Sequence, residues 1–362
     1  MLYVNLLNYV SSKRIGTLSW AINIVEVLKK KDLSVKYLVT EESELDKLLC
    51  DIGIERNQII ILKIRNNFFK HILTQYYLFK LTKSNDYIFT PYVGGLYINI
   101  GRKQIMVIHD LAWFNDTEKY TTLKRFALKI STKLLLLNCF KIITVSEWSK
   151  IDIKRTLKIE VSVMIPNTLT TFLNPDKKIV STSFNQKHPD FIFNKFVLSI
   201  GTIQNGKNYI NSAKVFEDTL AKKGFKYIII GDYKENSKIA ATIKSTFKNT
   251  ILTGYLEDDE MFYLLQNCVG FVNLSYYEGF GIPLLDAILF KKPALISDNS
   301  ALLDLALSSH IKVNPFDEEA IKEGFMNFTD GIVNTVETKN LLMKYSHSNV
   351  NTLISDFFDD IF

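Results

Sequence analysis

Short apolar runs alternate with longer amphipathic stretches along most of the chain. The first run, Leu2–Leu7, is followed over Leu18–Lys30 by apolar residues at helical spacing. Runs of this kind recur and predict a first series of β-strands: Leu2–Leu7, Val35–Val39, Ile59–Ile64, Tyr87–Phe89, Ile105–Ile108 and Lys141–Val145. Continuous apolar strands separated by helices are typical of parallel sheets that are covered on both faces.

A polar stretch with prolines, Thr168–Asp190, interrupts this pattern, and the alternation then begins again. The second series of predicted strands comprises Phe196–Ile200, Tyr227–Ile230, Thr250–Leu252, Gly270–Leu274 and Ala294–Ile296. The pattern predicts two doubly wound α/β domains in tandem. We place them at residues 1–172 and 195–340, with a linker at 173–194 and a final helical segment at 341–362.

The segment from Val272 to Lys292 carries the strongest chemical signal. An apolar strand runs into Tyr277, Glu278 and two glycines, and a proline then opens an apolar helix. Such a loop directs free backbone amides and the positive end of a helix dipole at its ligand, which suits phosphate or sugar hydroxyls. Asp286 places a carboxylate inside this apolar helix, where a charge is costly unless solvent or a ligand reaches it.

A second loop, Gly201–Asn208, leads from a predicted strand through two glycines to Lys207 at the mouth of a helix. A lysine in this position can hold a diphosphate. In doubly wound folds, ligands bind at the carboxyl ends of the strands, so the chemistry is expected in the cleft between the two domains.

Composition narrows the class of protein. The chain has 362 residues, 47% of them apolar, and three widely spaced cysteines without a CxxC pair, which suggests neither disulfides nor a zinc site. No stretch reaches the roughly 18 apolar residues of a membrane span. The net charge of +6 is spread along the chain, so nucleic acid is not an expected partner, and a cytoplasmic location fits.

At this point the two loops show a resemblance. Residues 277–287 resemble the signature of retaining GT-B glycosyltransferases, the large group called family four, and residues 201–208 resemble their diphosphate loop. Weaker matches complete the pattern at the expected distances: 108–110, 145–150, 165–167, 253–255 and 296–298. The resemblance covers nearly the whole chain and implies the GT-B fold, in which two Rossmann-like domains face each other across a cleft.

The resemblance also implies roles for individual residues. Lys207 would neutralise the departing diphosphate, Glu278 would contact the donor sugar, and Asp286 would hold the ribose. The donor-binding positions that it implies in the second domain are Gly201, Thr202, Asn208, Gly254, Tyr255, Phe280, Gly281, Ile282 and Asp286. No metal ligand and no cofactor are expected, because the nucleotide diphosphate sugar is itself the substrate.

The chain departs from the family pattern at two positions. The family usually has a glutamate where this chain has Asp286, and an arginine beside the lysine where it has Gly206. An arginine is a planar bidentate phosphate donor that lysine does not replace. In the first domain, the loop before the first helix contains Arg14 and Gly16, which resemble residues that approach the donor phosphates, and Arg14 is a candidate for the missing guanidinium.

His109 follows the strand Ile105–Ile108 and precedes Asp110, so its imidazole is expected at a carboxyl end. The resemblance implies that His109 touches the donor sugar or the reacting centre. It further implies an acceptor-binding first domain, a nucleotide-sugar-binding second domain and a segment 341–362 that braces the first.

Within the family, the chain is most similar to mannosyl- and rhamnosyltransferases that build O-antigen and capsule on a lipid carrier. That similarity implies a nucleotide sugar, with GDP-mannose before UDP- or dTDP-linked donors, and a lipid-linked oligosaccharide acceptor. A rival hypothesis is an inactive sugar- or nucleotide-binding subunit of a polysaccharide-assembling complex. An epimerase would need further acid and base carboxylates, and a nicotinamide dehydrogenase would need a GxGxxG after the first strand, where the chain reads Asn8–Ser12.

Two segments, Lys63–Lys83 and the helix around Lys124–Lys133, concentrate aromatic and basic side chains. One hypothesis is peripheral contact with the inner membrane surface. The other, which the sequence favours, is an ordinary amphipathic helix with its basic face in water.

Overall fold

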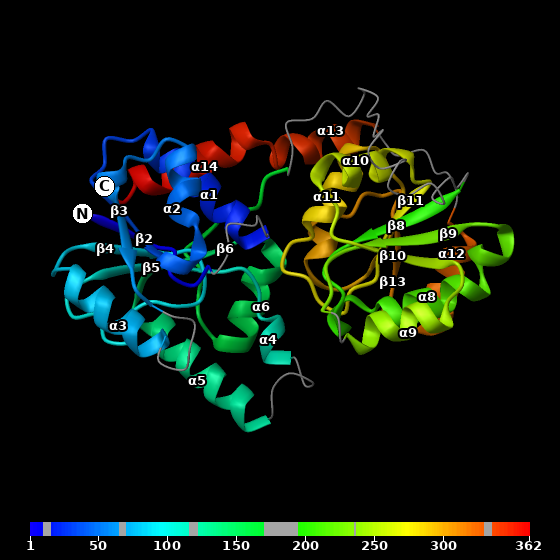
Figure 1. The fold of residues 1–362 in the computed structure, drawn as a ribbon, viewed down its shortest axis with the longest axis horizontal. Helices are drawn as coiled ribbons and strands as arrows, with labels where there is room; N and C mark the ends of the chain where they lie inside the picture. Colours follow the sequence, from blue (N-terminus) through cyan, green and yellow to red (C-terminus); the bar gives the residue numbers. More distant parts are fainter. Residues whose placement is uncertain (10–15, 65–69, 116–121, 170–194, 235–236, 329–334) are drawn as a thin grey trace. The chain divides into compact units, whose positions relative to one another are not determined.

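The computed structural model describes residues 1–9, 16–64, 70–115, 122–169, 195–234, 237–328 and 335–362. These residues form two compact units: the first comprises Met1–Thr168 with His347–Phe362, and the second comprises Leu169–Ser346. Each unit has its own parallel sheet between layers of helices (Figure 1). The expected linker at 173–194 lies outside the described residues, and the two units divide between residues 168 and 169.

The first unit is built on a seven-stranded sheet of order β3-β2-β1-β4-β5-β6-β7, in which all pairs are parallel. Its strands are β1 Leu2–Asn5, β2 Val35–Thr40, β3 Ile59–Leu62, β4 Tyr87–Thr90, β5 Lys103–Ile108, β6 Cys139–Thr144 and β7 Val163–Met164. The first six confirm the predicted runs. The order reverses between β1 and β4, which is the topological switch point where doubly wound sheets bind ligands.

Helices cover both faces of this sheet: α1 Gly16–Lys29, α2 Leu45–Asp51, α3 Lys70–Leu81, α4 Ala112–Asn115, α5 Thr122–Leu137, α6 Glu147–Leu157 and α14 His347–Asp359, with 3₁₀ turns η1 Glu41–Ser43 and η2 Arg56–Gln58. Figure 1 shows α1 and α14 together on one face and α3 and α5 on the other. Phe358 of α14 is fully buried, with its ring 5.7 Å from that of Phe89 in β4. The last helix of the chain is therefore part of the core of the first unit.

The second unit has a six-stranded parallel sheet of order β10-β9-β8-β11-β12-β13. Its strands are β8 Phe196–Ile200, β9 Lys226–Ile230, β10 Thr250–Gly254, β11 Gly270–Asn273, β12 Ala294–Ser297 and β13 Ile311–Val313. The first five confirm predicted strands. The switch point here lies between β8 and β11, so the strand order repeats that of the first unit, apart from the added edge strand β7.

The helices of the second unit are α8 Tyr209–Asp218, α9 Lys238–Thr246, α10 Asp258–Asn267, α11 Ile282–Leu289, α12 Glu318–Met326 and α13 Thr335–Lys344, with 3₁₀ turns η4 Asn205–Lys207, η5 Leu220–Lys223 and η6 Ser300–Leu305. In Figure 1, α10 and α11 lie on one side of the sheet and α8 and α9 on the other. The expected helix at 341–362 is divided: α13 ends at Lys344 in the second unit, and α14 begins at His347 in the first.

Local sequence explains several helix starts. Ser146 Oγ accepts a hydrogen bond of 3.0 Å from Ser149 N at the start of α6, and Asp317 accepts 3.1 Å bonds from two amides of α12. At α11 the residue before the helix is Gly281 with φ 103°, and Pro283 lies in the first turn. A side chain at position 281 would meet Leu302 at 2.8 Å, so glycine is required there for conformation and for space.

Candidate functional site

The two motif loops lie side by side in the second unit because they leave adjacent strands. β8 and β11 pair in parallel at the switch point, with Val197 opposite Gly270 and Leu198 opposite Phe271. The loop after β8 contains η4 with Lys207 at its end, and the loop after β11 contains Glu278 before α11. Tyr276 N donates a 2.9 Å hydrogen bond to Gly206 O, which joins the two loops through their backbones.

Lys207 and Glu278 form an ion pair at the carboxyl edge of the sheet. Lys207 Nζ donates to Glu278 Oε1 at 2.5 Å, and the side chains are 19% and 14% exposed, so a ligand can still reach both. Ser275 Oγ donates to the same carboxylate oxygen at 2.8 Å, and Asn273 Nδ2 lies 3.5 Å from it. Charge-assisted bonds of this kind fix the carboxylate, and through it they position the ammonium group.

Glycines allow the loop Gly201–Asn208 to pack closely against its neighbours. Gly201 N donates to Ile230 O at 2.8 Å, and Gly231 N donates to Gly254 O at 3.0 Å, so the ends of β8, β9 and β10 are tied together. A Cβ added at Gly231 would lie 2.0 Å from Gly201 O, which no real side chain tolerates. Gly231 is therefore a structural requirement of this loop that the sequence motif did not reveal.

Other predicted donor-binding residues lie in the loops at the carboxyl edge of the same sheet. Thr202 and Tyr255 are exposed at loops that follow β8 and β10, and Gly254 has φ 77°. Partial burial, with Glu257 and Asp258 nearby, raises the pKa of Tyr255. Asn208 is buried in the left-handed conformation, and its Nδ2 donates to Pro315 O at 3.0 Å. The amide of Asn208 thus anchors the loop to a segment more than a hundred residues later.

The remaining residues predicted to bind the donor lie at and near the start of α11. Ile282 is its first residue, and the first amides of a helix have no partner within the helix. Phe280 is 5% exposed and packs edge-on against Tyr345 at 5.3 Å between ring centroids. Asp286 lies in the second turn and is 3% exposed. The loop from Phe280 to Ile282 is therefore held by packing, with its amides at the end of a helix.

In the first unit, His109 lies directly after β5. Its Nε2 is 3.0 Å from Pro91 O, and because a carbonyl can only accept, the hydrogen belongs to Nε2 and Nδ1 is an acceptor. Burial lowers the pKa of His109 to about 4, although the Pro91 contact acts in the opposite direction. The imidazole is therefore neutral at physiological pH and can accept a hydrogen bond from a hydroxyl. Gly16 begins α1 and is exposed, whereas Arg14 lies outside the described residues.

The described part of the chain was searched for metal sites and for membrane-spanning helices. No group of three or more His, Cys, Asp or Glu side chains there is arranged to hold a metal ion. None of the described helices combines the length and the apolar character that crossing a bilayer requires.

Comparison with known proteins shows which family part of the chain matches. The family of glycosyl transferases group 1 matches residues 183–331, which include both motif loops. Solved structures with the same fold include Anabaena Alr3699/HepE in complex with UDP and glucose, with a TM-score of 0.73 at 12% identity over 99% of both chains. WaaG, a glycosyltransferase involved in lipopolysaccharide biosynthesis, has a TM-score of 0.65 at 14% identity over 98% of this chain and 95% of that one.

The fold is thus the GT-B fold of the solved glycosyltransferase structures. Residues 183–331 match the glycosyl transferases group 1, and this match confirms the resemblance seen in the two loops.

Curated relatives include O-antigen chain mannosyltransferase RfbU of Salmonella typhimurium, which is 24% identical over 270 residues, or 71% of this chain and 69% of the relative. O-antigen chain mannosyltransferase B of Escherichia coli is 22% identical over 226 residues, or 60% of this chain and 59% of the relative. The matched part therefore leaves about a third or more of each relative uncovered.

Proposed function

We propose that this protein is a retaining, metal-independent hexosyltransferase of O-antigen or capsule biosynthesis. It moves mannose, with rhamnose or another hexose as alternatives, from a nucleotide diphosphate sugar to a lipid-linked glycan at the cytoplasmic face of the membrane. The observation that carries the proposal is the Lys207–Glu278 pair at the switch point of a group 1 domain. The names of the curated mannosyltransferase relatives support mannose, with GDP-mannose as the leading donor.

The proposed chemistry follows from the charges and dipoles of the loops after β8 and β11. The bond between the anomeric carbon and the diphosphate oxygen breaks through an oxocarbenium-like state, and negative charge grows on the diphosphate. Lys207, the amides of Phe280–Ile282 and the dipole of α11 stabilise that charge. The acceptor hydroxyl attacks from the side that the diphosphate leaves, its proton passes to the diphosphate, and the anomeric configuration is retained.

Glu278 and His109 have complementary parts in this scheme. Once the diphosphate takes the ammonium of Lys207, the carboxylate of Glu278 is available to accept hydrogen bonds from hydroxyls of the donor sugar. Neutral His109 accepts a further hydroxyl hydrogen at Nδ1. Asp286 accepts from the ribose. The protein thus orients the donor and stabilises the leaving group without a covalent intermediate.

The test is a thermal-shift screen against GDP, UDP, dTDP and their sugar conjugates, with a chelator in place of metal. A ligand at about 100 times its Kd stabilises a folded protein by about 2.7 kcal/mol. We expect a selective shift with GDP-mannose, followed by transfer to a lipid-linked acceptor. The anomeric coupling in the NMR spectrum of the product reports retention. A folded protein that binds no nucleotide sugar, or binds one without turnover, would favour the inactive-subunit hypothesis.

The exposed face of α5 supports membrane contact. Its outward apolar side chains, spaced three or four residues apart, are between 45% and 79% exposed: Leu123, Phe126, Ile130, Leu134 and Leu137. Lys124, Lys129 and Lys133 are exposed among them. An ordinary amphipathic helix buries its apolar residues, so the interpretation favoured from the sequence accounts only for the inner face of α5. An apolar stripe with basic neighbours complements an anionic lipid surface.

Replacing Phe126 and Ile130 with serine should lower binding to phosphatidylglycerol-containing vesicles at least tenfold in a sedimentation assay. The matched control is the double variant Val336→Ser and Met343→Ser, because these side chains of the second unit are 68% and 58% exposed. The control should bind as the native protein does. If the native protein does not sediment with vesicles, or the α5 variant sediments equally well, the membrane proposal is wrong.

A further inference from the structure

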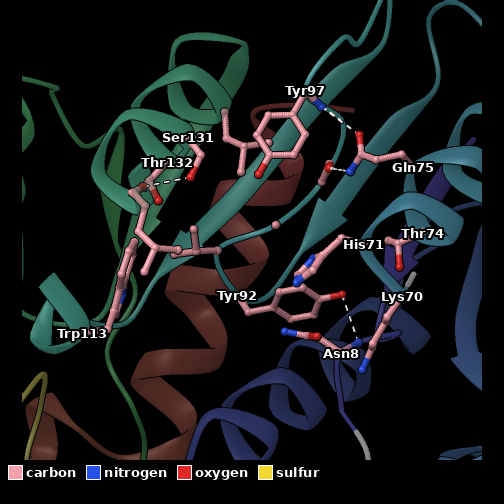
Figure 2. A pocket seen from close by; sticks show the side chains of 15 residues that line it. Asn8, Lys70, His71, Thr74, Gln75, Tyr92, Tyr97, Trp113, Ser131 and Thr132 are labelled. Atoms are coloured by element: carbon pink, nitrogen blue, oxygen red, sulfur yellow. Dashed lines mark hydrogen bonds between the residues drawn. The ribbon is translucent and has the colours of Figure 1, made fainter. Parts of the chain in front are cut away.

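A pocket of about 440 Å³ opens within the first unit. Its wall includes Asn8 after β1, Tyr92 after β4 and Trp113 after β5, so it lies at the carboxyl edge of the sheet. β1 and β4 flank the switch point, the position at which doubly wound sheets bind ligands. Lys70 and Gln75 of α3 and Thr132 of α5 complete the part of the wall shown in Figure 2. A volume of this size is typical of small-molecule sites, which span about 300–1,000 Å³.

Lys70 is the unusual member of this wall. It is 7% exposed, and within the described residues its ammonium group makes neither a hydrogen bond nor an ion pair. Burial lowers the pKa of Lys70, and the charge of Glu42 only partly opposes this. Lys70 is also the first residue of α3, where the helix dipole is positive. A buried cation at this end of a helix is costly without an anion beside it.

The remaining wall is suited to a sugar. Gln75 is already occupied, since its Nε2 donates to Gly95 O and its Oε1 accepts from Tyr97 N. Tyr92 Oη donates to Asn5 Oδ1 at 2.9 Å. These bonds make a fixed polar wall, and Figure 2 shows Trp113 at the end of the pocket away from Lys70. An aromatic face can pack against a sugar ring, and fixed polar groups in such a wall set the orientation of the ligand.

None of the described residues that line the pocket is acidic, so Lys70 is not neutralised from within the wall. We propose that this pocket binds an anionic group carried by the acceptor glycan, with Lys70 as its counter-ion. The proposal rests on the proposed glycosyltransferase function and names the acceptor class. The anion is either the carboxylate of an acidic sugar or the phosphate that joins the glycan to its lipid.

The arrangement of α5 favours the phosphate. Leu128 and Thr132 on the inner face of this helix line the pocket, while Phe126 and Ile130 on its outer face are exposed. One helix thus separates the pocket from the surface that we propose for lipid. A phosphate next to a lipid chain would lie close to such a surface.

The test measures binding of simple probes to the full chain by calorimetry: methyl glucoside, methyl glucuronide and glucose 1-phosphate. We expect the native protein to bind an anionic probe at least tenfold more tightly than methyl glucoside, which corresponds to about 1.4 kcal/mol. Lys70→Gln should abolish that preference. If methyl glucuronide binds more tightly than glucose 1-phosphate, the anion is a sugar carboxylate. If glucose 1-phosphate binds more tightly, the anion is a phosphate.

Two controls locate the effect. Lys80→Gln changes an exposed lysine of the same helix and should keep the preference. Lys207→Ala should also keep it, since a preference lost there would assign the anion to the diphosphate loop and overturn the proposal. A preference that is absent in the native protein, or that survives in Lys70→Gln, would overturn it too.

Melting curves show that each variant is folded, and Lys70→Gln should melt no lower than the native protein because it removes a charge whose burial is costly. Nucleotide-sugar binding is measured on the same samples. If the protein binds no nucleotide sugar but prefers the anionic probes, only the proposed function is wrong. If it binds a nucleotide sugar but shows no preference for the anionic probes, only the proposal for the pocket is wrong.

Discussion

Replacing Lys207 with alanine is expected to lower kcat for sugar transfer by about 10²- to 10³-fold, the size of effect seen when one donor to a developing negative charge is removed. The physical reason is that the ammonium of Lys207, fixed by Glu278 at 2.5 Å, is the cation available to the departing diphosphate in this loop. Because charge on the diphosphate grows as the bond breaks, kcat should fall more than donor affinity. Initial rates at saturating donor measure the effect.

The control is Lys214→Ala, which breaks another lysine–glutamate pair in the same unit, with Glu318 at 2.8 Å. The side chains of Lys214 and Glu318 are 53% and 48% exposed, so loss of this ion pair should change kcat less than twofold. Glu278→Gln should also reduce transfer, and combining it with Lys207→Ala should cost less than the two effects added, because the residues act as a pair. Additive losses, or a Lys207 variant with native kcat, would contradict the assigned role.

Changing Gly231 to alanine is expected to disrupt the loop Gly201–Asn208. The new Cβ would lie 2.0 Å from Gly201 O and 2.6 Å from the carbon of the same carbonyl, and backbone atoms cannot rotate away as side chains can. The loop must therefore move, at a cost of about 1–3 kcal/mol in stability. Since this loop carries Gly201 and leads to Lys207, nucleotide binding should be lost at the same time. Denaturant unfolding and calorimetry measure the two effects.

Gly206→Ala is the matched control for this change. It lies in the same loop, yet an added Cβ there meets nothing within 4 Å. We expect a change in stability within about 0.5 kcal/mol, as for most surface substitutions, and unchanged nucleotide binding. If Gly231→Ala bound nucleotide as the native protein does, the close approach of the two backbones would not be needed for the site.

The strands with long apolar runs could be predicted from the sequence, because burial on both faces leaves continuous apolar segments such as Ile59–Ile64. The sequence did not predict β7 and β13, which have two and three residues and are edge strands of their sheets. So short a segment forms because a neighbouring strand offers it hydrogen bonds. The position of that neighbouring strand depends on the tertiary fold and leaves no pattern in the sequence of the short segment.

The site was predictable to the same degree. Lys207 and Glu278 belong to motifs, and the structure brings them together through the pairing of β8 with β11. Ser275 and Asn273, which hold Glu278, have no separate signal, although their place between an apolar strand and the glycine loop could have drawn attention. Lys70 looked like one basic residue among many. Its burial depends on how α3 packs, which the sequence alone does not disclose.

The contact between Lys207 and Glu278 also affects which anions the loop can bind. A lone ammonium group beside a helix terminus would collect any small phosphate from solution, but here a carboxylate already balances it. An incoming anion has to compete with that carboxylate, and a doubly charged diphosphate with a sugar to engage Glu278 competes better than inorganic phosphate. On the proposed function, we therefore expect the pair to discriminate against abundant small anions, and Glu278 to bind Lys207 again when the nucleotide leaves.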